Sequence, residues 1–442
     1  MTFFAIVRDI ANFIWGPQML IFILGSGIYF SFRLKAIQFR KFNFAVNATT
    51  KSFRSSGEGN ITPYQALMSA LSGIIGNGNI AGVATAIFMG GPGAIFWMWL
   101  SALILMATMY SESLLGFKYR EQDKDGTYLG GPMVYIQKGL RWKWLAVAFA
   151  FAMGFKTLLA TTSIQSNSMS IVLNNQFNIP LIYSCIGIAV LTWLVIIGGL
   201  KAIARTTQFL TPFMTIAYLA GGIIILIFNF NKLPSVFDQI FTYAFTPKGA
   251  IGGFAGAGVM MALRYGAARG AYSNEAGTGS VAILHATAQS DSPVRQSLIA
   301  MLGVFIDTVI ICSITALVVL LFNQWTSDLN STALVSESFK QGIPAGNWIV
   351  LGASLLFGYS TLIVWCFYGE QCAAYLFGDK VKFFYRWLFC FSILFGANSS
   401  AENIWSWGDL LNGLTVIINL IGILALSPVV VRTTFEKLKI ST

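Results

Sequence analysis

Long apolar stretches recur from one end of the chain to the other, separated by short polar and basic segments. A helix needs about 20 mostly apolar residues to cross roughly 30 Å of hydrocarbon, and each stretch is long enough for one span. Eleven spans are predicted, beginning near Trp15, Gln65, Gly91, Leu145, Pro180, Thr206, Gly252, Gln296, Asn347, Phe383 and Leu410. The pattern predicts an all-α integral membrane protein whose single transmembrane domain covers residues 1–442.

Composition supports lipid as the main solvent of this chain. Hydrophobic residues make up 56% and charged residues 10% of the sequence, and the mean hydropathy is +0.69. The first apolar run, Trp15 to Phe30, follows a single early basic residue and lacks an Ala-x-Ala-like cleavage signal, so we interpret it as a span. The five cysteines lie in or beside apolar runs without ligand spacing, and we expect neither a disulfide nor a metal centre.

The basic residues predict the orientation of the spans. The net charge of +11 is spread over short connecting segments rather than one face, which argues against nucleic-acid binding. With the N-terminus outside, 21 of the 28 Lys and Arg residues fall in inside loops and four in outside loops. Cytoplasmic loops carry the excess of basic residues. We therefore expect a multi-pass plasma-membrane protein with the N-terminus outside and the C-terminus cytoplasmic.

Internal organisation is visible in the second and seventh spans, which are the two most interrupted by Gly, Asn and Ser. They are five spans apart, as expected for corresponding helices of two inverted five-helix repeats. The pattern predicts a five-plus-five inverted repeat preceded by one accessory helix. The accessory helix would cover about residues 15–34, repeat one about 65–230 and repeat two about 250–430.

The second span, SALSGIIGNGNIAGVATAIFMGG, places Gly76, Asn77, Gly78 and Asn79 at mid-helix. Such residues weaken a helix, and unwound backbone at this depth is tolerated where it lines a cavity or is covered by protein. The half-helix after the break would offer amides to a carboxylate, and the half-helix before it would offer carbonyls to a cation. Close helix packing through the glycines is the alternative.

Ionisable residues within the spans are costly in hydrocarbon and indicate functional or paired groups. In the seventh span, Arg269 and Glu275 form either an ion pair or a gate. Elsewhere, Lys156 needs an internal partner, for which Glu112 is the hypothesis. Asp307 is either a functional carboxylate or an acceptor of hydrogen bonds between helices.

Adjacent hydroxyls in the ninth span, Ser360 and Thr361, are candidate ion ligands, although such hydroxyls usually bond the backbone of their own helix. The single histidine, His285, has no Cys or carboxylate at ligand spacing. No nucleotide-binding loop, catalytic triad order or zinc motif occurs in a plausible context, so we do not expect an enzyme.

The chain resembles the sodium:alanine or glycine symporter family, of the leucine-transporter fold class, over nearly its whole length. The matching stretches are GNGNIAGVATAIFMGGPGAIFWMW, ESLLGFKYRE, GGPMVYI, QSNS, ARGAYSNEAGTGS, FIDTVIICSITALVV, FYGEQCAAYLFG and WGDLLNGL. The sequence departs from the family pattern in having Asn77 where Thr is usual and Val364 where Gly is frequent.

The resemblance implies the residues of two sites. The substrate carboxylate would bind the backbone at Asn77 and Gly78, beside Gly76 and Asn79, and the pocket would be faced by Gln165 and Asn167. The co-transported sodium ion would be held by five groups: the carbonyls of Ser72, Ile75 and Phe357 and the hydroxyls of Ser360 and Thr361.

The function implied is sodium-coupled import of alanine or glycine by alternating access in a bacterial or archaeal plasma membrane, with no obligatory protein partner. A proton-coupled amino acid carrier of the same fold is the alternative, with Lys156 or Asp307 as its titrating group. A sensor that binds its ligand without moving it is a third hypothesis, from a different class.

Overall fold

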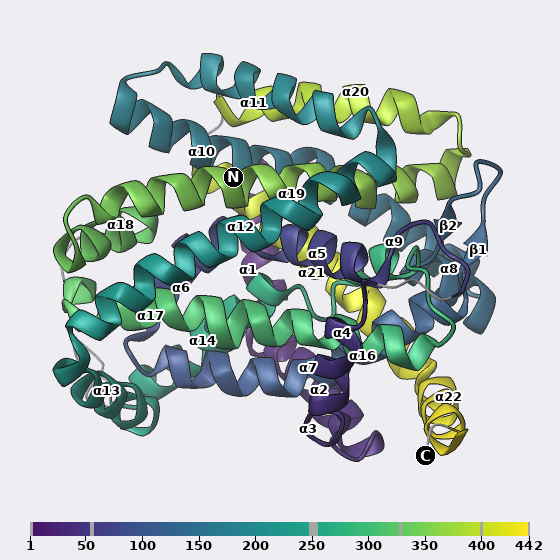
Figure 1. Ribbon diagram of the computed structural model, residues 1–442, viewed down its shortest axis with the longest axis horizontal. Helices are drawn as coiled ribbons and strands as arrows, with labels where there is room; N and C mark the ends of the chain where they lie inside the picture. The colour runs from purple at the N-terminus through teal and green to yellow at the C-terminus, as the bar shows by residue number, and fades with distance from the viewer. Residues whose placement is uncertain (1–2, 54–56, 247–254, 327–328, 398–400, 441–442) are drawn as a thin grey trace.

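The computed structural model describes residues 3–53, 57–246, 255–326, 329–397 and 401–440, which are almost entirely helical (Figure 1). The first group of helices comprises α1 (Phe3–Ile14), α2 (Pro17–Arg33), α3 (Ile37–Arg40), α4 (Phe42–Thr50), α5 (Pro63–Ile74), α6 (Ala81–Gly90) and α7 (Ala94–Lys118). Two short antiparallel strands follow, β1 (Glu121–Gln122) and β2 (Tyr128–Leu129). The next helices are α8 (Pro132–Tyr135), α9 (Lys143–Phe155), α10 (Thr162–Phe177), α11 (Leu181–Ile196), α12 (Gly199–Phe228) and α13 (Leu233–Phe245).

The second half of the chain is also mostly helical. It contains α14 (Ala255–Asn274), α15 (Ser280–His285), α16 (Pro293–Val304), α17 (Cys312–Leu321), α18 (Ser331–Gly342), α19 (Gly346–Phe377), α20 (Val381–Ile393), α21 (Ala401–Ala425) and α22 (Ser427–Ile440). Two segments of π-helix, Lys156–Thr161 and Phe305–Ile311, join α9 to α10 and α16 to α17. Such turns are frequent at functional positions, and these two carry the buried Lys156 and Asp307.

Helical structure is present within each of the eleven predicted spans, and the predicted start of the seventh, Gly252, lies outside the described residues. Among the described residues, seven continuous helical segments are long and apolar enough to cross a membrane, and α5 with α6 makes an eighth if the bent pair is one span. Helix α11 is shorter, at 16 residues, and α20 has 13. The number eleven therefore stays a prediction, whereas a multi-span helical membrane protein is confirmed.

The start of α5 is stabilised by residues at its own N-terminus. Thr62 accepts a hydrogen bond from the Gln65 amide, and the Gln65 side chain accepts one from the Thr62 amide, both at 3.1 Å. Pro63 occupies the first helical position, where its missing N–H costs nothing. This start is well defined, so the interruption of the same span thirteen residues later is a property of Gly76 and its neighbours.

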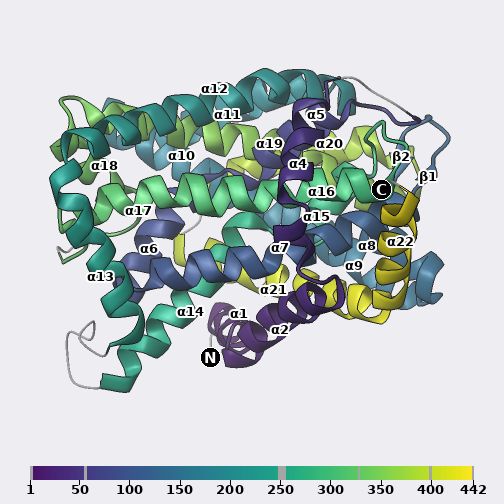
Figure 2. The ribbon, with the colours of Figure 1, turned by 60° about the horizontal axis from the view of Figure 1, so that its bottom comes forward.

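The long helices lie side by side (Figures 1 and 2), and the contacts between them define two groups. Helices α5, α6, α7, α14 and α16 contact one another in the first group, and α9, α10, α11, α19 and α20 contact one another in the second. Helix α19 also contacts α5, which joins the groups at the centre of the molecule.

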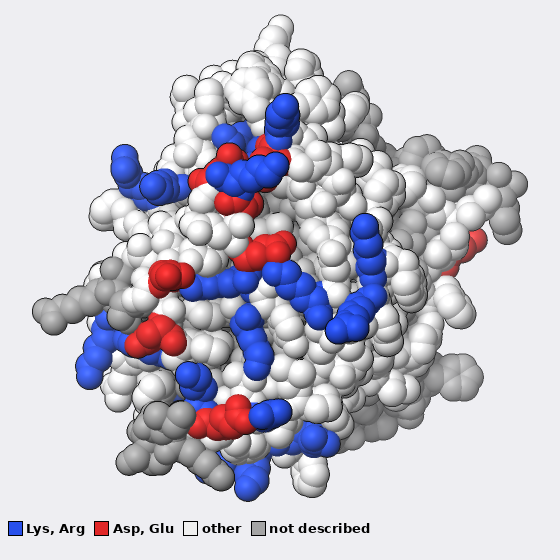
Figure 3. Space-filling model, turned by 90° about the vertical axis from the view of Figure 1, so that its right-hand side faces the viewer, with Lys and Arg blue, Asp and Glu red and all other residues white. Residues whose placement is uncertain are grey.

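One end of the molecule is rich in charged side chains (Figure 3). Helices α13 and α18 lie at one end, and the β1–β2 hairpin and α22 lie at the other (Figure 1). The end with the hairpin gathers many Lys, Arg, Asp and Glu side chains, as Figure 3 shows. We refer to it below as the charged end.

Candidate functional site

The second span is broken at the predicted place. Helix α5 ends at Ile74 and α6 begins at Ala81, and the span bends by 59° between α5 and the helical segment Asn77–Gly90. The Gly76 amide donates to the Asn79 side chain at 2.9 Å, and the Asn79 amide donates to the Gly76 carbonyl at 3.1 Å. Within the described residues, no acceptor lies within hydrogen-bonding distance of the Asn77 and Gly78 amides. Two adjacent backbone donors are thus left at the break.

A small cavity of about 40 Å³ lies beside this break. Gly76 and Gly78 line it from the broken span, Gln165 from α10, Thr361 from α19 and Ser273 from α14. The space is that of a few water molecules rather than a large side chain. In this closed arrangement, only a small ligand fits without the helices moving apart.

The three asparagines predicted at the substrate site do not line this cavity. Asn77 donates to Gln165 at 3.0 Å and accepts from Ser354 at 2.6 Å. Asn79 donates to Asp307 at 2.5 Å. Asn167 donates to the carbonyl of Gly396 at 2.7 Å, beyond the end of α20, so the expectation that it faces the pocket is wrong. Its position on the helix turns it toward a packing contact.

Five oxygen atoms meet where α19 passes the end of α5, and they are the five that the resemblance assigns to sodium. The Ser360 hydroxyl lies 3.3 Å from the Ser72 carbonyl and 3.0 Å from that of Phe357. The hydroxyl of Thr361 lies 3.3 Å from the carbonyls of Ser72 and Ile75, and 2.8 Å from that of Phe357. The structure therefore brings all five together in the buried interior.

The donor count of this cluster fits a cation. Each hydroxyl has one proton, and both can be donated to the Phe357 carbonyl of their own helix. The carbonyls of Ser72 and Ile75 then face oxygen lone pairs. Hard cations of calcium's size bind oxygens at about 2.3–2.6 Å, which separates neighbouring ligands by roughly 3.3–3.7 Å. The observed separations, 2.8–3.3 Å, approach this range.

Gly76 lies close to Thr361 of α19. A Cβ atom added there would lie 2.9 Å from the Thr361 hydroxyl and 3.4 Å from the Gln165 amide nitrogen. Any larger residue would therefore displace the hydroxyl cluster. A glycine is therefore favoured at position 76 by the lack of space for a side chain as well as by the conformation of the break.

Asp307 is buried and joins three elements, namely its own π-helical segment, the broken second span and α14. It accepts hydrogen bonds from Asn79 at 2.5 Å, from Ser273 at 2.9 Å and from Thr308 at 2.8 Å. Of the two interpretations left open by the sequence, these contacts establish its role as an acceptor between helices. They do not test a further role in transport.

The partner of Lys156 is Glu275, not Glu112. The Lys156 ammonium lies 3.4 Å from the Glu275 carboxylate, donates to Asn412 at 2.6 Å, and lies over the Trp365 ring at 4.3 Å from its centroid. The predicted pairing with Glu112 is therefore wrong, because Glu112 accepts from Asn419 at 2.8 Å and from the Gly277 amide at 3.1 Å. Glu275 forms an ion pair with Lys156, and the two alternatives for Arg269 and Glu275, an ion pair or a gate, stay predictions.

Sequence reasoning missed Trp365 and Asn412 as neighbours of this charge. Trp365 also donates to the Gly73 carbonyl at 3.0 Å, one of the groups freed near the break. An indole N–H must find an acceptor when it is buried, which was the available signal for Trp365. No pattern in the sequence indicated Asn412.

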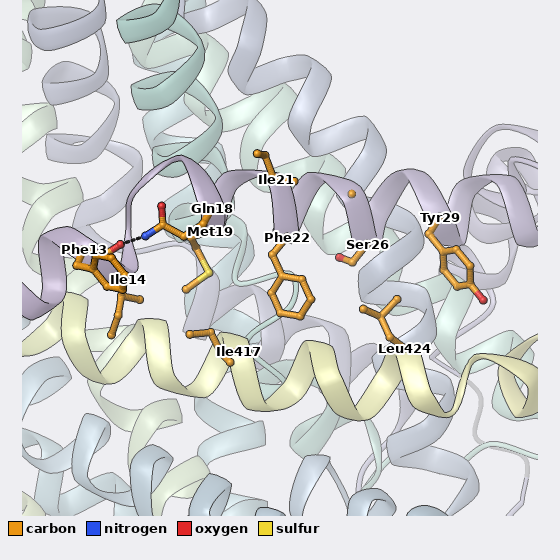
Figure 4. Close-up of a pocket in the computed structure, with 11 residues that line it drawn as sticks. Phe13, Ile14, Gln18, Met19, Ile21, Phe22, Ser26, Tyr29, Ile417 and Leu424 are labelled. Atoms are coloured by element: carbon orange, nitrogen blue, oxygen red, sulfur yellow. Dashed lines mark hydrogen bonds between the residues drawn. The ribbon is translucent and has the colours of Figure 1, made fainter.

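A larger, apolar groove of about 710 Å³ lies outside the packed groups, between α1, α2 and α21 (Figure 4). Phe22, Met19, Ile417 and Leu424 line it, and Figure 4 shows a Gln18 side chain hydrogen-bonded to the Phe13 carbonyl at one end. Its lining is mostly apolar, and its polar side chains are those of Gln18, Ser26 and Tyr29. The central cavity, although smaller, has the polar chemistry.

The chain matches the sequence profile of the sodium:alanine symporter family over residues 1–439. It is 40% identical over 443 residues to the sodium/alanine symporter AgcS of Methanococcus maripaludis, covering 98% of this chain and 97% of that protein. It is 35% identical over 430 residues to a Bacillus subtilis protein named as a probable sodium/glutamine symporter, GlnT, covering 96% of this chain and 88% of that one.

Among solved structures, the fold is similar to that of MhsT in complex with L-phenylalanine. The TM-score is 0.60 and the sequence identity 13%, and the match covers 86% of this chain and 99% of the other. This likeness confirms the leucine-transporter fold.

Proposed function

The chain belongs to the sodium:alanine symporter family and is a secondary amino acid transporter of the membrane, and we propose that it imports alanine or glycine together with sodium. Neither the family nor the fold is that of an enzyme. The observation that carries the proposal is the cluster of five oxygens contributed by Ser72, Ile75, Phe357, Ser360 and Thr361.

The substrate is proposed to bind beside this cluster. Its carboxylate would accept hydrogen bonds from the Asn77 and Gly78 amides, which have no other described acceptor. These amides lie just before α6, where the positive end of the helix dipole favours a negative charge. The cavity of about 40 Å³ favours the smallest side chains.

Coupling follows from the broken helix, which would contribute to both sites. Ser72 and Ile75 precede the break and would hold sodium, and Asn77 and Gly78 within it would hold the carboxylate. Each ligand then favours the same arrangement of the span, so each strengthens binding of the other. Alternating access would follow as the group containing α5, α6, α7, α14 and α16 rocks against the group containing α19.

The charged end is proposed to face the cytoplasm, which places the N-terminus outside and the C-terminus inside a bacterial plasma membrane. The excess of Lys and Arg in the loops assigned to that side supports this orientation. One sodium with a zwitterion carries one net charge inward, worth about 2.3 kcal/mol per 100 mV of inside-negative potential.

The test is uptake of labelled alanine, glycine and glutamine into proteoliposomes. An inward sodium gradient should drive alanine or glycine uptake, and an inside-negative potential should increase it. Thr361→Val removes a hydroxyl from the oxygen cluster and should raise the half-saturating sodium concentration at least about tenfold, since a ligand to a charged group contributes about 1.5–3 kcal/mol.

Thr85→Val is the matched control. Thr85 lies in α6, the second half of the broken span. Its hydroxyl donates to the Ala81 carbonyl of its own helix at 2.7 Å. It should leave sodium dependence unchanged. Uptake driven by a proton gradient in the absence of sodium would replace this proposal with the proton-coupled carrier, and binding without uptake would replace it with a sensor.

A further inference from the structure

The apolar groove of about 710 Å³ between α2 and α21 lies on the outer surface of a membrane span. The helical segment Ile6–Arg33 is long and apolar enough to cross the membrane, and two side chains that line the groove, Phe13 and Ile21, are 75% and 73% exposed. Exposed apolar surface of this size marks a contact with protein or lipid. We call this space the α2–α21 groove.

The groove has the direction and length of a lipid tail. Its lining follows α2 from Gln18 to Tyr29, with Ile417 and Leu424 of α21 on the opposite side (Figure 4). At 1.5 Å per residue this part of α2 is about 16 Å long, which is about half of the roughly 30 Å hydrocarbon layer. A tail in one leaflet covers the same depth and, like a spanning helix, runs along the membrane normal. The shape therefore favours an elongated apolar occupant.

The middle of the groove has space and few polar groups. A Cβ atom added at Gly25 would meet no atom of the described residues within 4 Å. The neighbouring Ser26 hydroxyl donates to the Ile23 carbonyl at 2.7 Å, and the Gln18 side chain donates to the Phe13 carbonyl. Between its ends, the groove is therefore suited to hydrocarbon.

Hydroxyl groups mark one end of the groove. Tyr29 lines this end, and its hydroxyl lies 2.9 Å from that of Ser427 at the start of α22. Their hydrogen bond uses one of the two hydroxyl protons, so the other can be donated to a further acceptor. Tyrosine is enriched where hydrocarbon meets lipid headgroups. This end therefore has the chemistry expected at the level of lipid ester and phosphate groups.

Positive charge gathers beyond the same end. Arg33 follows Tyr29 by about one helical turn, and its guanidinium lies 5.7 Å from the centre of the Tyr29 ring. The Lys35 ammonium lies 5.5 Å from the centre of the Phe435 ring of α22. Both basic residues are exposed, and neither forms an ion pair with another described residue. An apolar length thus ends at two positive charges that have no counter-ion in the described part of the chain.

We propose that the α2–α21 groove binds one acyl chain of an anionic phospholipid, whose phosphate is held by Arg33 and Lys35. The tail gains close contact with α2 and α21, and the headgroup gains two positive charges, each of which strengthens binding of anionic lipid. A neutral lipid would use only the apolar part of this site, and a soluble anion only the charged part. The bound lipid fastens α2, within the predicted accessory helix, to α21.

The test is native mass spectrometry of the full-length protein, titrated in detergent with dioleoyl phosphatidylglycerol or dioleoyl phosphatidylcholine. The two lipids share their tails, and only the first carries a net negative charge. One phosphatidylglycerol should bind at least about tenfold more tightly than phosphatidylcholine, because two basic residues contribute. Equal affinity of the two lipids would overturn the headgroup assignment.

Two variants test the basic residues. Arg33→Gln and Lys35→Gln should each raise the half-saturating phosphatidylglycerol concentration about fivefold and change that of phosphatidylcholine less than about twofold. Lys380→Gln is the matched control, since Lys380 is exposed and does not line the groove. It should leave both concentrations unchanged. An equal loss in all three variants would overturn the assignment of the phosphate to Arg33 and Lys35.

Gly25→Leu tests the groove itself, because the new side chain would occupy the space of the tail. It should raise the half-saturating concentration of both lipids at least about tenfold. Gly187→Leu is the matched control: Gly187 is exposed in α11, outside the groove, and a Cβ there also meets nothing within 4 Å. Leucine suits a helix better than glycine, so both variants should unfold at or above the wild-type midpoint in detergent. Unchanged lipid binding in Gly25→Leu would overturn the proposal.

Two further results would assign the groove or its charges differently. Glycerol phosphate, which has the charge without the tails, should not displace phosphatidylglycerol, and displacement at equal concentration would assign binding to the charges alone. A dimer in the spectra that Gly25→Leu abolishes would assign the groove to a second copy of the chain. Either result would overturn the lipid assignment, whatever the outcome of the sodium uptake experiment.

Discussion

The two broken spans of this protein share a glycine-rich sequence and differ in what happens to their backbone. At the first break, the Asn77 and Gly78 amides have no described acceptor. At the second, between α14 and α15, the Ala276 amide donates to the Asn274 side chain and the Gly277 amide to Glu112, both at 3.1 Å. The backbone amides at the first break are available to a ligand, whereas those at the second are hydrogen-bonded to side chains.

The carbonyls show the same difference. Around the first break, the carbonyls of Ser72 and Ile75 have only the hydroxyls of Ser360 and Thr361 as described donors, and these hydroxyls can donate to the Phe357 carbonyl instead. At the second break, the Gly277 carbonyl accepts from Asn419 at 2.9 Å and the Glu275 carbonyl from Thr278 at 2.7 Å. Buried backbone groups need partners. A break whose backbone amides and carbonyls lack hydrogen-bond partners indicates a binding site. A break whose backbone groups are hydrogen-bonded to side chains indicates a structural role.

The largest effect on stability is expected from removing the Lys156 ammonium, which forms an ion pair with Glu275 at the second break. Lys156→Met would leave the Glu275 carboxylate buried beside an apolar side chain, and breaking such a pair costs about 3–5 kcal/mol. The midpoint of thermal unfolding in detergent should fall sharply. The double variant Lys156→Met/Glu275→Gln should recover much of it, and an unchanged midpoint in the single variant would contradict the importance of the pair.

The next effect is expected at the first break and concerns binding. Gly76→Ala would place a Cβ atom 2.9 Å from the Thr361 hydroxyl. Overpacking of this kind costs about 1–3 kcal/mol, so the half-saturating sodium concentration for uptake should rise about tenfold. Gly82→Ala, where a Cβ meets nothing within 4 Å, should leave it unchanged. If Gly76→Ala and Gly82→Ala changed the half-saturating sodium concentration equally, a specific role of Gly76 in sodium binding would be contradicted.

A smaller effect is expected where the second break is tied to α7. Glu112→Gln keeps the side-chain shape and weakens the hydrogen bonds to Gly277 and Asn419 by removing their charge. We expect a loss of about 1–2 kcal/mol in unfolding free energy, with the half-saturating alanine concentration unchanged. A changed alanine concentration with full stability would assign Glu112 to the binding site.

The smallest effect is expected at Asn167, whose hydrogen bond to Gly396 packs the second helix group together. Asn167→Ala should lower stability by about 1 kcal/mol and leave the half-saturating alanine concentration unchanged. Gln165→Ala, at a position that lines the central cavity, should raise that concentration. A similar rise for Asn167→Ala would contradict the position described above.

Residue chemistry alone determined much of this protein. Apolar length predicted the spans, because lipid tolerates little else, and the Gly and Asn residues at positions 76–79 predicted the break, because they weaken any helix locally. The resemblance assigned five oxygens to sodium, and the structure brings them together, although their binding of sodium stays a prediction.

The tertiary structure alone decided which buried polar groups face each other. Lys156 meets Glu275 rather than Glu112, and Asn167 turns to Gly396 rather than to the cavity. These choices depend on the rotation and depth of helices far apart in the chain, which packing between complementary surfaces sets. A sequence shows that a buried charge needs a partner, and only the packed helices determine which partner lies within reach.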